Sequence, residues 1–104
     1  MDISKKDWAL FRERLAGWQE AYMERLLQEY VELICSSGNA SDRFRELEKR
    51  MKADRRKPGV ILEVRKSNVV YDLAKLIRDG VISVEDLTDF SDEVQEYVIH
   101  LLNG

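Results

Sequence analysis

The first third of the chain contains no proline, and its large apolar side chains recur mostly at steps of three and four residues. A helix turns once every 3.6 residues, so this spacing collects them on one face. The resulting stripe consists of Trp8, Phe11, Leu15, Trp18, Tyr22, Leu26, Tyr30, Leu33 and Ile34. Ser4 and Asp7 resemble a capping box, so we predict one helix over residues 5–35, about 45 Å long. Either later helices cover this length, or another chain buries part of the stripe.

A second, highly charged helix is predicted over residues 42–55. The segment "SSGNAS" stops the first helix, with Gly38 or Asn39 suited to a left-handed conformation and Ser41 to an N-cap. The segment "KPG" ends the second helix, because the residue before a proline avoids the α conformation. The apolar positions of this helix form a narrow stripe at Phe44, Leu47 and Met51.

The remainder of the chain predicts shorter helices at 68–78, 84–88 and 92–102, each preceded by a serine or asparagine that can cap it. Apolar residues alternate over 60–65 as in a strand, but no second segment offers a partner strand. An extended connector or an early turn of the next helix suits this segment better. The predicted fold is all-α: a long N-terminal helix packed with a charged second helix and two or three shorter C-terminal helices, in a single domain spanning 1–104.

The charges are unevenly distributed, although the net charge is only −3. Residues 1–42 carry a net charge of −3, residues 43–66 of +6 and residues 67–104 of −6. The middle segment is therefore a basic island between two acidic flanks.

Composition indicates a folded, soluble protein. Apolar residues make up 44% of the chain, too many for a disordered sequence. The single cysteine excludes an internal disulfide, and the N-terminus has no signal-peptide pattern. No apolar run approaches the ~18 residues that a membrane-spanning helix needs. We therefore expect a cytoplasmic protein with no membrane partner.

No set of residues has the specificity of a catalytic, metal or cofactor motif. The segment "DGVISVEDL" looks like the second half of an EF-hand loop, but alignment on Gly80 puts Lys75 and Ile77 at ligand positions. His100 and Cys35 are too few for a zinc site, which takes about four ligands. The acidic residues of the last third mostly lie at predicted helix N-termini, where they favour the helix dipole. No phosphate-binding loop is present. We expect no cofactor, no bound metal and no enzymatic activity.

Two surfaces are candidates for binding a partner. The first is the aromatic part of the long helix, which is either a core stripe or a surface buried against another chain. Its residues are Trp8, Phe11, Trp18, Tyr22 and Tyr30. The second is a basic patch that could contact phosphates or an acidic protein surface. Its residues are Arg43, Arg50, Arg55, Arg56, Lys57, Arg65 and Lys66.

Two features of the basic patch argue against nucleic acid. Four acidic residues are interleaved with it, and the chain as a whole is acidic. It also has no aromatic residue among its arginines to stack on bases. Basic residues at a helix C-terminus favour the dipole without any ligand. An acidic protein surface is therefore the better expected partner.

Three stretches, "SKKDWALFRERLAGWQEAYMERL", "FRELEKRMKADRRKPGV" and "DGVISVEDLTDFSDEVQEYV", resemble a family of short bacterial all-helical proteins of unknown function. The resemblance spans nearly the whole chain and implies no catalytic or ligand residues. Some members carry a multidrug-transporter label, which does not suit a chain without a membrane-spanning segment.

The sequence therefore predicts a small non-enzymatic protein-interaction module, self-associating through its long N-terminal helix as a homodimer or binding another protein. The alternative is a nucleic-acid-binding accessory protein that uses segment 43–66.

Overall fold

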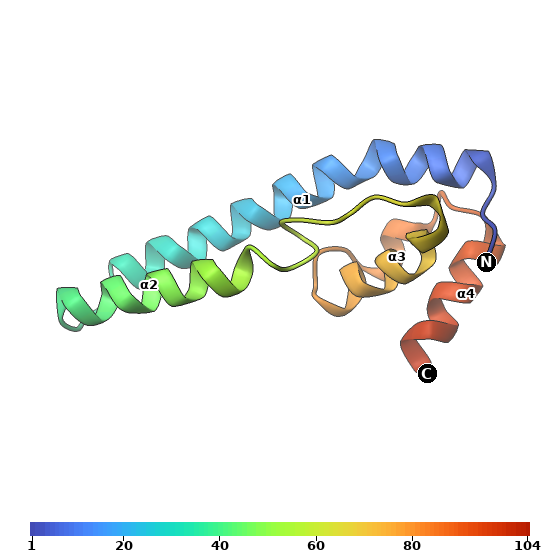
Figure 1. Ribbon diagram of the computed structural model, residues 1–104. Coiled ribbons are helices and arrows are strands. Elements are labelled where there is room, and N and C mark those ends of the chain that lie inside the picture. The colour runs from blue at the N-terminus through green and yellow to red at the C-terminus, as the bar shows by residue number, and fades with distance from the viewer.

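The computed structural model describes all residues, 1–104, and contains only helices and connecting segments (Figure 1). This confirms the all-α prediction. Four α-helices and two short 3₁₀ helices follow in the order α1 (Lys5–Ile34), α2 (Ala40–Asp54), η1 (Lys66–Asn68), α3 (Val69–Arg78), η2 (Val84–Leu87) and α4 (Asp92–Asn103).

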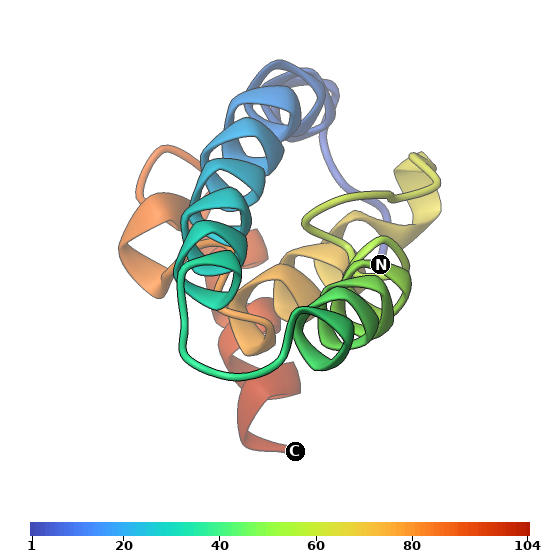
Figure 2. The ribbon, with the colours of Figure 1, turned by 90° about the vertical axis from the view of Figure 1, so that its left-hand side faces the viewer.

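The molecule is elongated, with extents of 52 × 26 × 20 Å, because α1 runs along its whole length (Figure 1). The second half of α1 packs antiparallel against α2, and we call residues 20–55 the arm. The first half of α1 packs with α3, η2 and α4, and we call residues 1–18 together with 66–104 the head. Figure 1 shows the arm projecting from the head, and Figure 2 views the same molecule from the free end of the arm, with the head behind it.

The long apolar stripe of α1 is covered by two successive partners within the chain. Phe11 and Leu15 are buried in the head, and Leu26 and Tyr30 are buried where α2 crosses the second half of the helix. The Trp18 ring lies between them and contacts the Phe11 ring edge-on at 6.5 Å between centroids. The later helices therefore cover the stripe along most of its length, but Ile34 at its end stays 48% exposed.

The core of the head forms where α3 packs against α4 and the first half of α1. The apolar side chains that recur at helical spacing in α3 and α4 point into this core. The largest fully buried side chains are Phe11, Leu73, Leu76, Leu87, Val69, Val70, Val94 and Val98. Within the α-helices, their spacing follows the 3.6-residue period.

The N-termini of α1 and α4 are joined by one buried carboxylate. Asp7 accepts hydrogen bonds from the Ser4 hydroxyl at 3.0 Å, the Ser91 hydroxyl at 2.7 Å and the Ser91 backbone N–H at 3.0 Å. Each serine hydroxyl in turn accepts a backbone N–H from its own helix. The predicted capping residues are correct, but the Asp7 carboxylate bonds to the cap of α4 instead of the Ser4 backbone.

Two local predictions need correction, and the alternatives left open for segment 60–65 are resolved in favour of a connector. Asn39 precedes the first residue of α2, so Ser41 lies inside the helix and is not its cap. The predicted helix at 84–88 is a 3₁₀ turn with a capping box between Ser83 and Asp86. Residues 61–65 have no regular structure, so this segment is a connector. Gly38 and Gly80 have positive φ values of 124° and 72°, as expected for the ends of α1 and α3.

The connector begins with a tight corner packed against α1. Gln19 donates a side-chain hydrogen bond to the Pro58 carbonyl at 2.9 Å. Gly59 is buried against the face of the Tyr22 ring. The corner therefore holds the end of the arm against the middle of α1.

Candidate functional site

The two helices of the arm are joined by a buried polar contact. The Tyr30 hydroxyl donates a hydrogen bond of 2.6 Å to the Asp54 carboxylate, and Lys57 lies 3.1 Å from the other oxygen of Asp54. Burial and the hydrogen bond to Asp54 raise the pKa of Tyr30 to about 12. Burial alone would raise the pKa of Asp54, but hydrogen bonds from Tyr30 and Lys57 bring it below its ordinary value. Asp54 is therefore a charged anchor between α1 and α2.

Two arginines of α2 also bind within the arm. Arg43 donates to the carbonyls of Ile34 and Gly38, which lie at the free end of α1 and the following turn. Arg50 forms an ion pair of 3.1 Å with Glu29, and its guanidinium lies above the Tyr30 ring. The partner of Arg50 is therefore an acid from α1, and Glu46, four residues earlier in α2, is not paired with it.

The other face of the arm is apolar and exposed. Five large apolar side chains with exposed fractions of 48–72% contribute to it: Leu27, Val31, Ile34, Phe44 and Met51. Leu47 and Met23, which are half-buried, fill the space between the two helices. We call this set of seven residues the arm face.

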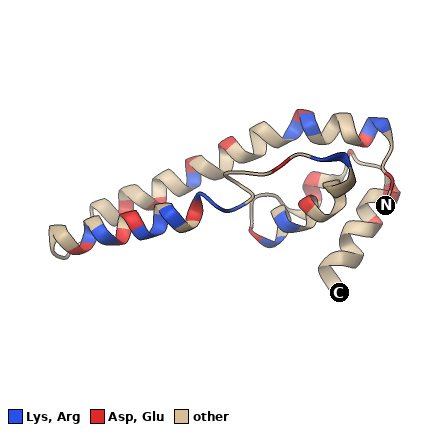
Figure 3. Cartoon of the chain, in the orientation of Figure 1, with Lys and Arg blue, Asp and Glu red and all other residues tan.

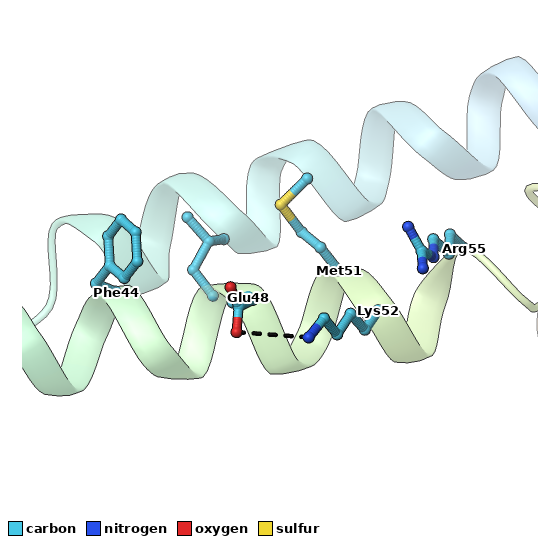
Figure 4. Close-up of a pocket in the computed structure, with 6 residues that line it drawn as sticks. Phe44, Glu48, Met51, Lys52 and Arg55 are labelled. Carbon is cyan, nitrogen blue, oxygen red and sulfur yellow. Dashed lines mark ion pairs between the residues drawn. The ribbon is translucent and has the colours of Figure 1, made fainter.

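The arm face is hollowed along its length. A depression of about 410 Å³ runs along α2 past Phe44, Leu47 and Met51 (Figure 4). Two smaller depressions share residues with it and extend it to α1 at Leu27 and Ile34. The depressions therefore form one continuous apolar groove over both helices.

The two edges of the arm face carry different charges. On the α1 edge, Glu20 and Glu24 are exposed and lie one helical turn apart, and neither has an ion-pair partner within the chain. On the α2 edge, Lys52 pairs with Glu48 at 3.6 Å (Figure 4), and Arg55 has no acidic partner. The α1 edge is thus acidic, and the α2 edge near the head is basic.

The aromatic candidates predicted on the long helix lie in the protein's own core. Phe11, Tyr22 and Tyr30 are buried. Trp18 is half-buried and packs on Phe90 with ring centroids 6.4 Å apart. Trp8 is half-buried with the Arg12 guanidinium above its ring. The apolar side chains that α1 exposes come from its other stripe, on the arm face.

The basic candidates are dispersed and mostly paired. Arg65 forms an ion pair with Glu63, in addition to the contacts of Arg43, Arg50 and Lys57 within the arm. Figure 3 shows basic residues at both ends of the connector, so the patch is interrupted along its length. Four of the predicted seven have no acidic partner in the chain: Arg43, Arg55, Arg56 and Lys66. Of these, Arg43 is held by backbone carbonyls.

No group of three or more histidine, cysteine or acidic side chains lies close enough together to hold a metal ion. Cys35 and His100 are both exposed and lie on different helices. No helix combines the length and the apolar character needed to cross a membrane.

Asp72 is a buried acid, and its Oδ2 atom has no hydrogen-bond partner. Burial raises the pKa of Asp72, so the folded state holds this proton more tightly than the unfolded chain. Stability contributed by protonated Asp72 is therefore present below pH 3.8 and is lost as the pH rises through the folded pKa. We expect Asp72→Asn to stabilise the protein by about 1 kcal/mol at neutral pH.

Urea unfolding of the Asp72→Asn protein at several pH values measures this effect. The variant should lack the loss of stability that the wild type shows above pH 3.8. Glu96→Gln, at an exposed position of α4, serves as the control and should leave the pH profile unchanged. Equal pH profiles for Asp72→Asn and the wild type would show that ionisation of Asp72 does not cause the loss of stability.

No protein-family model, curated protein or solved structure matches the chain. The family resemblance suggested by its sequence therefore stays a prediction.

The arm face was not predicted as a site, although Ile34, Phe44, Leu47 and Met51 were recognised as apolar positions, because each helix was assigned a single apolar stripe. Leu27 and Val31, four residues apart, form a second stripe adjacent to the buried one and meet it at Ile34. A helix whose apolar face is wider than one neighbour can cover is the signal that could have revealed it.

Proposed function

We propose that this protein is a non-enzymatic protein-interaction module that docks its partner on the arm face. The observation that carries the proposal is the set of five large apolar side chains exposed together on two packed helices. Contiguous apolar patches of this kind are rare on monomeric proteins unless they bind something. The polar edges of the groove complete the arrangement of an apolar centre and a charged rim that is typical of protein interfaces.

The rigidity of the arm supports this function. The Tyr30–Asp54 hydrogen bond lies beneath the groove, and together with the Arg50–Glu29 ion pair it holds α1 and α2 together. A partner therefore meets a preformed surface, and binding costs little ordering of the backbone.

Site-specific photo-crosslinking in cells of the source organism tests the proposal. Phe44 is replaced by p-benzoylphenylalanine, and the same replacement at Ala53 is the control. These positions are nine residues apart and point to opposite sides of α2, because a helix turns 100° per residue. We expect protein adducts at position 44 and not at position 53. The adducts should disappear when Leu27→Glu places a charge across the groove.

Equal crosslinking at positions 44 and 53, or adducts that persist in the presence of Leu27→Glu, would overturn the proposal. Phe44 and Leu27 are 72% and 54% exposed, so neither replacement removes a core side chain. Circular dichroism checks that each variant keeps its helical content.

A further inference from the structure

We propose that the occupant of the arm face is a second copy of this chain, and that two arms form a four-helix bundle. The tip of each arm is the turn between α1 and α2, and both tips lie at the same end of the bundle. This inference rests on the proposed function and names the partner for the same surface. It follows from the shape of the arm, the charges on its edges and the position of the head.

The shape of the arm suits packing against a copy of itself. Two antiparallel helices with one exposed apolar face form half of a four-helix bundle. Two such faces can be related by a two-fold axis in two ways. An axis across the arm places α1 on α1 and α2 on α2, whereas an axis along the arm places α1 of each chain on α2 of the other.

Edge charges select the axis along the arm. A rotation about this axis leaves the distance of each residue from the tip unchanged. Residues of the two chains that face each other are therefore equally far from the tip. Glu20 lies 14 residues before the end of α1, and Arg55 lies 15 residues after the start of α2, so both are about 21–22 Å from the tip. Each chain's Glu20 therefore faces Arg55 of the second copy, and neither residue has a charged partner within its own chain.

A second pair of charges follows the same geometry. Glu24 lies about 15 Å from the tip and Lys52 about 18 Å. The axis along the arm brings the acidic edge of one chain to the basic edge of the other on both sides of the bundle. The axis across the arm instead places the two acidic edges on the same side, with no basic residue opposite them.

The head leaves the arm face accessible. Arg25 of α1 donates a hydrogen bond of 2.6 Å to the Gly80 carbonyl at the end of α3. Arg25 and Leu27 are two residues apart and so differ by about 200° around the helix. The contact of α1 with the head therefore lies on nearly the opposite side of the helix from the arm face.

The size of the arm face sets the expected affinity. The 15 residues of α2 span about 22 Å, and two helices side by side are about 20 Å wide. A dimer of this footprint buries on the order of 1,000 Å² in total, at the lower end of specific interfaces. We expect a dissociation constant in the micromolar range, on the order of 10 µM.

Sedimentation equilibrium of the full chain up to about 1 mM tests for the dimer. We expect a monomer–dimer equilibrium for the wild type. Phe44→Glu should weaken it by on the order of 100-fold, because it places a charge at the centre of the apolar interface. Ala53→Glu adds the same charge to the opposite side of α2 and should leave the equilibrium unchanged.

A charge swap tests the arrangement of the helices. Glu20→Arg alone and Arg55→Glu alone should each weaken the dimer, because each places like charges together across the interface. The double variant restores both pairs and should recover the wild-type equilibrium. Failure of the double variant to recover would overturn the axis along the arm.

The two proposals can fail separately. A chain that stays monomeric to about 1 mM while position 44 crosslinks to a different protein would overturn the self-association and retain the interaction module. A monomeric chain without adducts at position 44 would overturn both. Loss of dimer in Ala53→Glu as well as Phe44→Glu would place the interface elsewhere and overturn this inference.

Discussion

Gly59→Ala is expected to destabilise the protein by about 3 kcal/mol, because the added methyl group has no space. A Cβ atom at this position would lie 2.2 Å from Cδ2 and 2.6 Å from Cε2 of the Tyr22 ring. Tyr22 is only 7% exposed, so its ring has little room to move away. The corner of the connector must shift instead, which strains the hydrogen bond from Gln19 to the Pro58 carbonyl.

This effect is steric, since the φ angle of Gly59 is not among the positive values in the chain. A denaturant titration measures the loss. Gly17→Ala is the matched control, because no atom lies within 4 Å of the added methyl group. Gly17 lies inside α1, where alanine is the better helix former, so the control is expected to stabilise the protein by about 0.5–1 kcal/mol.

A double-mutant cycle identifies the source of the Gly59→Ala effect. In a Tyr22→Ala background the ring is absent, so Gly59→Ala should cost less than about 0.5 kcal/mol. An equal cost in both backgrounds would show that contact with Tyr22 is not the cause. The hydrogen bond from Gln19 would then remain the structural explanation to test.

This corner illustrates what sequence could predict. The proline and glycine located the end of α2, because the restrictions on the residue before a proline are local. The contact of Gly59 with Tyr22 joins positions 37 residues apart. No local rule predicts such a contact, since it depends on the angle at which the connector returns to α1.

The helices could be predicted from the sequence, whereas the exposure of the arm face could not. Periodicity is a property of one segment, so the buried positions of α3 and α4 could be assigned from spacing alone. Which of two adjacent stripes on α1 is covered depends on where α2 lies. The exposed position of Phe44 therefore emerges only from the packed structure.

The basic candidates show a second limit. Several of these side chains are held by partners within the chain, and some of those partners lie far away in the sequence. Arg50 pairs with Glu29 from a different helix, and Arg43 binds carbonyls at the end of α1. Charge counts along a chain therefore overestimate the basic surface that is available to a partner.

Asp7→Ala is expected to destabilise the protein by about 3 kcal/mol, because one carboxylate joins the caps of two helices. The variant leaves the Ser91 backbone N–H without its acceptor and removes the acceptor of both serine hydroxyls. Asp2→Asn, at an exposed neighbouring position, is the control and should change the stability by less than about 0.5 kcal/mol.

The pH dependence of the folding stability separates the effect of the Asp7 charge from the effect of the shape of its side chain. Burial alone would raise the pKa of Asp7, but hydrogen bonds from Ser91 and Ser4 lower it below 3.8. The ionised Asp7 therefore contributes stability that is present above pH 3.8 and is lost as the pH falls through the folded pKa. This direction is opposite to that of Asp72, so Asp72→Asn should retain the acid loss. Asp7→Asn should lack this acid loss in urea titrations, and an unchanged acid loss in Asp7→Asn would assign it to another carboxylate.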